Sequence, residues 1–124
     1  MKKSFDDSIV EDDPFLKLPP KVQLLYFHLM MKTDTEGFIR GVKYTSERIS
    51  GTKNWKSDLQ TLIDSGYIHI VHDNTYGETY VIAHYWANMK RDNNIVNKSP
   101  TIFQDAKSKL IDDEKAKVYR IRQT

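Results

Sequence analysis

The residues of this 124-residue chain that could do chemistry are four histidines and three pairs of neighbouring carboxylates. His69 and His72 lie three residues apart on one predicted strand, so alternation of side chains points them to opposite faces. Neither these two nor His28 and His84 have the spacing of a metal-binding motif such as HExxH. The carboxylate pairs are adjacent in sequence and diverge on a helix or strand, which is typical of helix caps and solvated surface: Asp6-Asp7, Asp12-Asp13 and Asp112-Asp113.

Motifs of enzymes and of exported proteins are also missing from the sequence. It has no glycine-rich phosphate loop, nucleophile elbow or kinase signature, so we expect neither catalysis nor a cofactor. The chain contains no cysteine, which excludes disulfides and thiolate metal sites and is typical of intracellular proteins. No apolar run approaches the roughly 18 residues of a membrane span, and the acidic N-terminus lacks a signal peptide. We therefore expect a cytoplasmic protein with no membrane partner.

A run of polar residues between positions 53 and 64 suggests a different chemistry. Basic, amide and hydroxyl groups recur there at helical spacing, and such groups bind phosphates or base edges. These residues, our candidate DNA contacts, are Lys53, Asn54, Lys56, Ser57, Gln60 and Thr61. A polar face also serves solubility alone, so the pattern by itself leaves an ordinary solvated surface open.

The opposite side of the same stretch predicts the helix that positions these groups. Trp55, Leu59, Leu62 and Ile63 form an apolar stripe, and Gly66 follows where a glycine commonly ends a helix. Residues 67–72 and 79–83 are rich in strand formers and flank the polar loop 73–78, which predicts a hairpin with Asn74 and Tyr76 in its loop.

Upstream segments complete the expected arrangement. We predict a helix over 21–32, a short strand over 38–40 and a second helix within 44–50. Asp12 followed by Pro14 predicts the start of a short helical turn. The expected fold class is α+β and mostly α, a winged helix-turn-helix with a small antiparallel sheet and a C-terminal helix. We divide the chain into a winged-helix domain, 1–103, with an N-terminal arm, 1–13, and a basic C-terminal helix or tail, 104–124.

The helix over 21–32 is apolar nearly all round. Beside its main stripe it carries a second apolar set, Leu24, Phe27 and Met31. Such a helix must be covered on both sides. A second copy of the chain, giving a homodimer, or burial under the N-terminal arm would each supply that cover.

The net charge of +2 gives weak support for a nucleic-acid partner, but its distribution is uneven. Residues 1–37 carry 5 basic and 7 acidic groups, residues 38–82 carry 5 of each, and residues 83–124 carry 9 and 5. The basic end includes Lys90 and Arg91, which we expect to contact phosphates beyond the hairpin. The basic segment can steer a polyanion, or it can be a solvated tail.

The sequence resembles the N-terminal domain of phage replisome organizers, DnaD-like replication initiators, over nearly the whole chain. The motifs that carry the resemblance are short: Ile9-Val10-Glu11-Asp12-Asp13-Pro14-Phe15-Leu16-Lys17-Leu18-Pro19, Gln23-Leu24-Leu25-Tyr26-Phe27-His28-Leu29, Asp34-Thr35-Glu36-Gly37-Phe38, Asp58-Leu59-x-x-Leu62-Ile63-x-x-Gly66-Tyr67-Ile68, Val81-Ile82-x-His84-Tyr85-Trp86, Asn93-Asn94-Ile95 and Ser99-Pro100-Thr101-Ile102-Phe103. Residues 42–46 depart from the family pattern, and the chain ends before the second, helical domain that usually engages the helicase or its loader.

The resemblance implies a winged-helix domain that binds origin double-stranded DNA in replication initiation and self-associates through its N-terminal region. Two alternatives remain at this point. The same fold serves transcriptional regulators, whose target is a promoter. It also serves protein-interaction modules that have lost DNA binding, which near-neutral charge over residues 38–82 favours; the partner would then be a replication or host protein.

Overall fold

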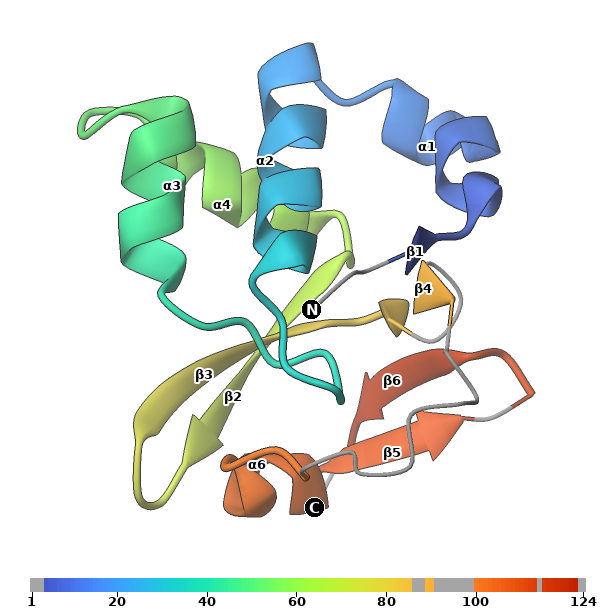
Figure 1. Ribbon diagram of the computed structural model, residues 1–124, viewed down its shortest axis with the longest axis vertical. Coiled ribbons are helices and arrows are strands. Elements are labelled where there is room, and N and C mark those ends of the chain that lie inside the picture. Colours follow the sequence, from blue (N-terminus) through green and yellow to red (C-terminus); the bar gives the residue numbers. More distant parts are fainter. Residues whose placement is uncertain (1–3, 86–88, 91–99, 114, 123–124) are drawn as a thin grey trace.

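The computed structural model describes residues 4–85, 89–90, 100–113 and 115–122, and has an α+β fold (Figure 1). Its first half is helical and its second half contains hairpins. The elements run in the order β1 (Ser4–Phe5), the 3-10 helix η1 (Asp7–Glu11), α1 (Asp13–Leu16), α2 (Pro20–Met31), α3 (Val42–Ser50), α4 (Trp55–Asp64), β2 (Ile68–Asp73), β3 (Gly77–Ile82), β4 (Met89–Lys90), α6 (Gln104–Ser108), β5 (Leu110–Asp113) and β6 (Val118–Ile121). No helix in the described part of the chain is long and apolar enough to cross a membrane.

Helices α2, α3 and α4 pack against one another on one side of the molecule (Figure 1). They match the three helices predicted from apolar spacing, and each begins or ends within two residues of the expected position. The main stripe of α2 is buried, with Leu25, Tyr26 and Leu29 fully removed from solvent. Burial of these large side chains is the main source of stability for the helical half.

The predicted hairpin is confirmed, with a first strand shifted by one residue and a shorter loop than expected. β2 and β3 pair antiparallel from Ile68↔Ile82 to Asp73↔Gly77. Gly77 has φ +81, a left-handed conformation that glycine adopts without steric cost. The segment around Phe38 adds to the free edge of β3, because Ile39 N–H donates to the Tyr80 carbonyl at 2.8 Å.

The N-terminal arm contains a short strand, β1, which pairs with β4, and its following residues pack on the helices. Ile9, in η1, is buried, and Asp12 caps α1 as predicted by accepting the Phe15 N–H at 3.0 Å. The Phe15 ring makes edge-to-face contacts with three aromatic rings, those of Tyr26, Phe27 and Tyr67, at centroid distances of 5.2 to 5.7 Å. The aromatic residues of α1, α2 and the entry to β2 therefore form one cluster.

Residues 104–124, expected to be a basic C-terminal helix or tail, do not form one continuous helix. Among the described residues of this segment only α6 is helical, and β5 and β6 follow it as a second hairpin, from Leu110↔Ile121 to Asp113↔Val118. Lys117 takes a positive φ of 54° at the turn between them. Tyr119 is buried, and its backbone N–H donates to the Ala83 carbonyl at 2.7 Å. Burial of this β-prone residue outweighs the helix propensity of the lysine-rich flanks.

Candidate nucleic-acid interface

Helix α4 presents the predicted DNA-contacting residues on its outer side. Leu59 and Leu62 anchor the inner side in the core, which fixes the rotation of the helix about its axis. The outer side and the preceding turn leave five of the six candidates exposed and Thr61 half-buried: Lys53, Asn54, Lys56, Ser57 and Gln60. The structure therefore brings these candidates together on one surface.

Local contacts hold several of these side chains. The Gln60 amide donates to Oδ1 of Asp64 at 2.8 Å, and the Thr61 hydroxyl donates to the Ser57 carbonyl at 3.0 Å. The Lys56 ammonium lies 5.6 Å from the centre of the Trp55 ring. Since Gln60 and Asp64 are both exposed, a base edge can replace Asp64 as the partner of the amide without leaving a buried group unpaired.

Packing of α2 on α4 adds a cation that the sequence pattern missed. The Lys21 ammonium lies 3.3 Å from Oδ1 of Asp58, and Lys21 is mostly exposed whereas Asp58 is buried. Oδ2 of Asp58 has no hydrogen-bond partner among the described residues. Asp58 lies on the buried side of α4 and Lys21 in the first turn of α2, so their pairing depends on how the two helices pack, which single-helix periodicity cannot show.

The predicted hairpin-tip residues lie against α6. Asn74 donates twice to Asp105, from its backbone N–H at 2.8 Å and from its side-chain amide at 3.1 Å. The Tyr76 ring meets the Phe103 ring edge-to-face at 5.2 Å, yet about half of Tyr76 stays exposed. Asn74 is thus engaged by a carboxylate from 31 residues further along the chain, a contact that no local sequence pattern indicates.

The buried Asp73 side chain accepts hydrogen bonds from both the hairpin tip and α6. Its Oδ1 accepts the N–H groups of Thr75 and Tyr76, and its Oδ2 accepts the Ala106 N–H at 3.0 Å. Burial alone would raise the pKa of Asp73. These hydrogen bonds and the charge of Lys109 have the opposite and larger effect, so the pKa lies below the usual range. One ionised carboxylate therefore joins the β2–β3 turn to α6.

The remaining predicted contacts are only partly described. Lys90 lies in β4, whose backbone pairs with Ser4, and Arg91 lies outside the described residues. Of the predicted self-association residues, Leu24 and Met31 are about half exposed on α2. Phe27 is half-buried because its ring packs against Phe15. Two of the three side chains are therefore available at the surface.

The histidines do not gather into a ligand set. The described residues include no group of three or more histidine or carboxylate side chains placed to hold a metal ion. His69 contacts the Tyr119 carbonyl through Nε2 at 2.9 Å, and Nδ1 of His84 is buried without a partner among the described residues. Burial, reinforced by the charge of His69 and only partly offset by Asp12, lowers the pKa of His84.

Comparison of the chain with protein-family models, curated proteins and solved structures found no match. Function is therefore argued from the arrangement of the residues themselves.

Proposed function

We propose that this protein is a winged-helix DNA-binding protein that acts in the initiation of DNA replication. The observation that carries the proposal is the outer face of α4, where Lys53, Lys56, Ser57 and Gln60 lie together. The order of elements supports it: α2, a short edge segment at Phe38, α3, α4 and the β2–β3 hairpin follow one another as the helices and wing of a winged helix do.

In the proposed complex α4 enters the major groove. Lys53 and Lys56 neutralise phosphates, Ser57 donates to the backbone, and the Gln60 carboxamide reads an adenine edge. Lys21, beside α4, neutralises the buried Asp58, so we assign it no phosphate contact. Of the wing residues, Tyr76 has the exposed surface to touch the DNA backbone, whereas Asn74 is occupied by Asp105. Lys90 and Arg91 add phosphate contacts beyond the hairpin.

The role in replication rests on the sequence resemblance to replisome organizers. The DNA-facing surface would serve a transcriptional regulator equally well, with a promoter in place of an origin. The exposed Leu24 and Met31 side chains support a homodimer formed through α2. Two copies would present two α4 helices to two half-sites.

A protein-interaction module is the second candidate function. The hairpin tip is surrounded by carboxylates, Asp73, Asp105 and Glu78, and acidic groups oppose a phosphate backbone. Under this interpretation α4 would be a solvated face and a replication or host protein would be the partner.

A fluorescence-anisotropy titration tests the DNA proposal. Labelled random duplex and single-stranded DNA are titrated with the protein at about 50 mM and about 200 mM salt, a range over which phosphate-dominated binding falls steeply. Duplex binding that weakens with salt, and that is further weakened in the double variant Lys53→Ala/Lys56→Ala, is expected. Lys115→Ala, an exposed lysine in the distant β5–β6 turn, is the matched control. Absence of duplex binding at the lower salt would overturn the proposal.

A further inference from the structure

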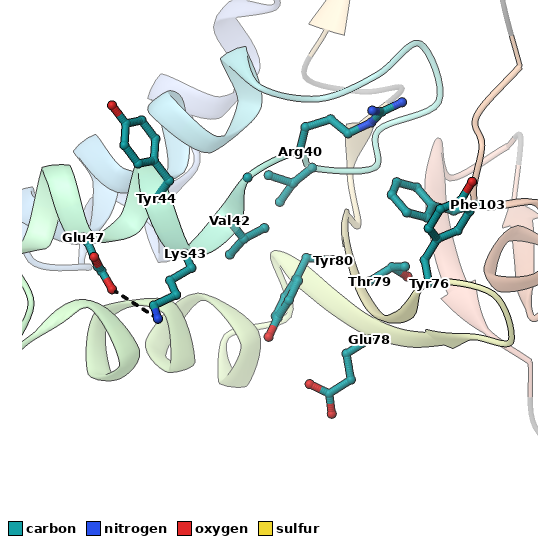
Figure 2. A pocket seen from close by; sticks show the side chains of 12 residues that line it. Arg40, Val42, Lys43, Tyr44, Glu47, Tyr76, Glu78, Thr79, Tyr80 and Phe103 are labelled. Atoms are coloured by element: carbon teal, nitrogen blue, oxygen red, sulfur yellow. Dashed lines mark ion pairs between the residues drawn. The ribbon is translucent and has the colours of Figure 1, made fainter.

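A groove runs between the start of α3 and the edge of β3, with a volume of about 710 Å³ (Figure 2). One wall is the segment from Ile39 to Val42, and the other is the strand from Glu78 to Tyr80. Phe103 and Tyr76 close one end, and Lys43 and Glu47 of α3 line the other. The polar face of α4 assigned above to DNA contributes no residue to the lining.

The groove begins where pairing along the β3 edge stops. Ile39 N–H donates to the Tyr80 carbonyl at 2.8 Å, and Ile82 N–H donates to the Gly37 carbonyl at 2.9 Å. Beyond Ile39 the chain leaves β3, because Arg40 N–H donates to the Lys32 carbonyl and the Gly41 carbonyl accepts from Thr45 at the start of α3.

This departure leaves the last position of that β3 edge, Glu78, without a partner strand. Backbone groups on an antiparallel strand alternate between its two edges, so Glu78 directs its N–H and carbonyl to the same edge as Tyr80 and Ile82. The position that would face Glu78 belongs to Gly41, which already leads into α3. An unpaired edge of this kind accepts an extended peptide as an added strand.

The charges and rings of the groove specify the side chains of such a peptide. Glu78 projects to the opposite side of the hairpin from Tyr76 and Phe103 (Figure 2), and it has no ion-pair partner within the described ranges. Of the other charged residues of the lining, Lys43 is paired with Glu47 at 3.9 Å, and the Arg40 guanidinium lies over the Phe103 ring, 5.6 Å from its centre. Glu78 is therefore the lining carboxylate that an incoming cation can reach without displacing a described ion pair. Because side chains of an added strand alternate, one set meets the carboxylate of Glu78 and the other meets the aromatic rings.

We propose that this groove binds an extended peptide of another protein by strand addition to β3, and that the peptide alternates basic and apolar side chains. The basic side chains pair with Glu78, and the apolar ones pack on Phe103 and Tyr76. The backbone of the peptide supplies the hydrogen bonds that Glu78 lacks. The groove shares Tyr76 with the DNA contacts proposed above but contains no residue of α4, so peptide binding does not depend on DNA binding by that helix.

The test uses a fluorescein-labelled eight-residue peptide of alternating lysine and valine, and a matched peptide with glutamate in place of lysine. Anisotropy should show binding of the lysine peptide and at least tenfold weaker binding of the glutamate peptide. Glu78→Lys replaces attraction by repulsion and should reverse this preference, with a change of about tenfold for the lysine peptide. Asp112→Lys, at an exposed position of β5, makes the same charge change elsewhere and should leave the preference intact.

Backbone pairing is tested separately with N-methylated peptides. N-methylation of alternate residues on one register removes the N–H groups that face β3, whereas methylation on the other register removes N–H groups that face solvent. One of the two peptides should lose binding and the other should keep it. Three results would each overturn the proposal. The lysine peptide could fail to bind at millimolar concentration, it could bind wild type and Glu78→Lys equally, or the two methylation patterns could have equal effects.

Discussion

The hydroxyl of Tyr67 donates a hydrogen bond of 2.7 Å to Oδ2 of Asp12, the oxygen that also accepts the Phe15 N–H at the start of α1. Tyr67 precedes β2, so this one carboxylate oxygen joins the hairpin to the N-terminal segment. Burial, reinforced by this hydrogen bond and by the charge of Asp12, raises the pKa of Tyr67 well above its usual range, so the hydroxyl stays protonated and remains a donor.

Tyr67→Phe removes this donor and keeps the ring. We expect the free energy of unfolding to fall by about 1–2 kcal/mol, because Asp12 loses a partly buried partner. Urea unfolding followed by circular dichroism measures the change. Tyr44→Phe is the control, since Tyr44 is exposed on α3, and it should alter stability by less than about 0.5 kcal/mol. Equal effects of the two changes would contradict the role of the bond.

Gly37→Ala should destabilise the protein strongly. Gly37 has φ +92, and an added Cβ would lie 2.8 Å from Cγ and 2.9 Å from Cβ of Tyr85. Strain and overpacking together should cost about 2–4 kcal/mol. Gly51→Ala has a similar φ of +84 with open space around it, and should cost less, about 1–2 kcal/mol from backbone strain alone. Thermal unfolding of both variants separates the steric clash from the backbone strain, and similar melting temperatures would show that the Tyr85 contact is unimportant.

Asp73→Asn should reduce the dependence of stability on acid pH. The pKa of Asp73 is lowered in the folded protein, so the ionised carboxylate stabilises the fold above about pH 4, the unperturbed value for aspartate. That stabilisation is lost as the pH falls through the lowered pKa. The variant should therefore melt below wild type at pH 7 and approach it at about pH 2–3. A difference in melting temperature that stays constant with pH would contradict this assignment.

Lys56→Ala and Gln60→Ala should affect DNA binding in different ways. Loss of Lys56 should weaken binding to all duplexes and reduce the slope of log affinity against log salt by about one. Loss of Gln60 should relax sequence preference and leave the slope unchanged, because its contact is to a base edge. Titrations with a selected site and a random duplex at several salt concentrations measure both quantities. Wild-type behaviour of both variants would show that α4 does not face DNA.

Deleting residues 104–124 should abolish cooperative unfolding of the remaining chain. Ala106, Leu110 and Tyr119 are buried, and Tyr119 donates through its hydroxyl to the Glu36 carbonyl at 2.8 Å. Tyr119→Ala is the milder test, and should cost about 3–5 kcal/mol through the cavity it leaves. Calorimetry measures whether the 1–103 fragment unfolds in a cooperative transition. A fragment that unfolds as cooperatively as the full chain would show that residues 104–124 are not part of the folding unit.

Much of the helical half could be predicted because its signals are local. The apolar stripe of Trp55, Leu59 and Leu62 predicted α4, and the pair Asp12 and Pro14 predicted α1. The end of α4 was predicted from Gly66, which has φ +84 in the structure. Each of these features is decided within a few residues of chain. The exposure of Lys53, Lys56 and Gln60 follows directly from the burial of the opposite side.

The segment from residue 104 onward could not be predicted in the same way, because distant residues determine its structure. The apolar residues Ala106, Leu110 and Val118 fit a loose helical spacing, yet Leu110 begins a strand whose partner ends at Ile121. The position of Asn74 depends on Asp105, and that of Glu36 depends on Lys107, which forms an ion pair with it. Such pairings can be predicted only when the fold is already known, because short-range propensity contains no information about them.

The hydrogen bond between the Thr101 hydroxyl and Asp34, which spans 67 positions, also has a consequence for how the chain reaches its native state. Helices α2 to α4 need only neighbouring segments and can form while the rest of the protein is still being synthesised. Closure over the turn at Asp34 must wait for the last quarter of the chain to leave the ribosome. Contacts of such high sequence separation slow folding, so we expect a fast phase for the helices and a later rate-limiting docking of residues 100–122. Until that step, the apolar side of the β2–β3 hairpin is exposed to chaperones.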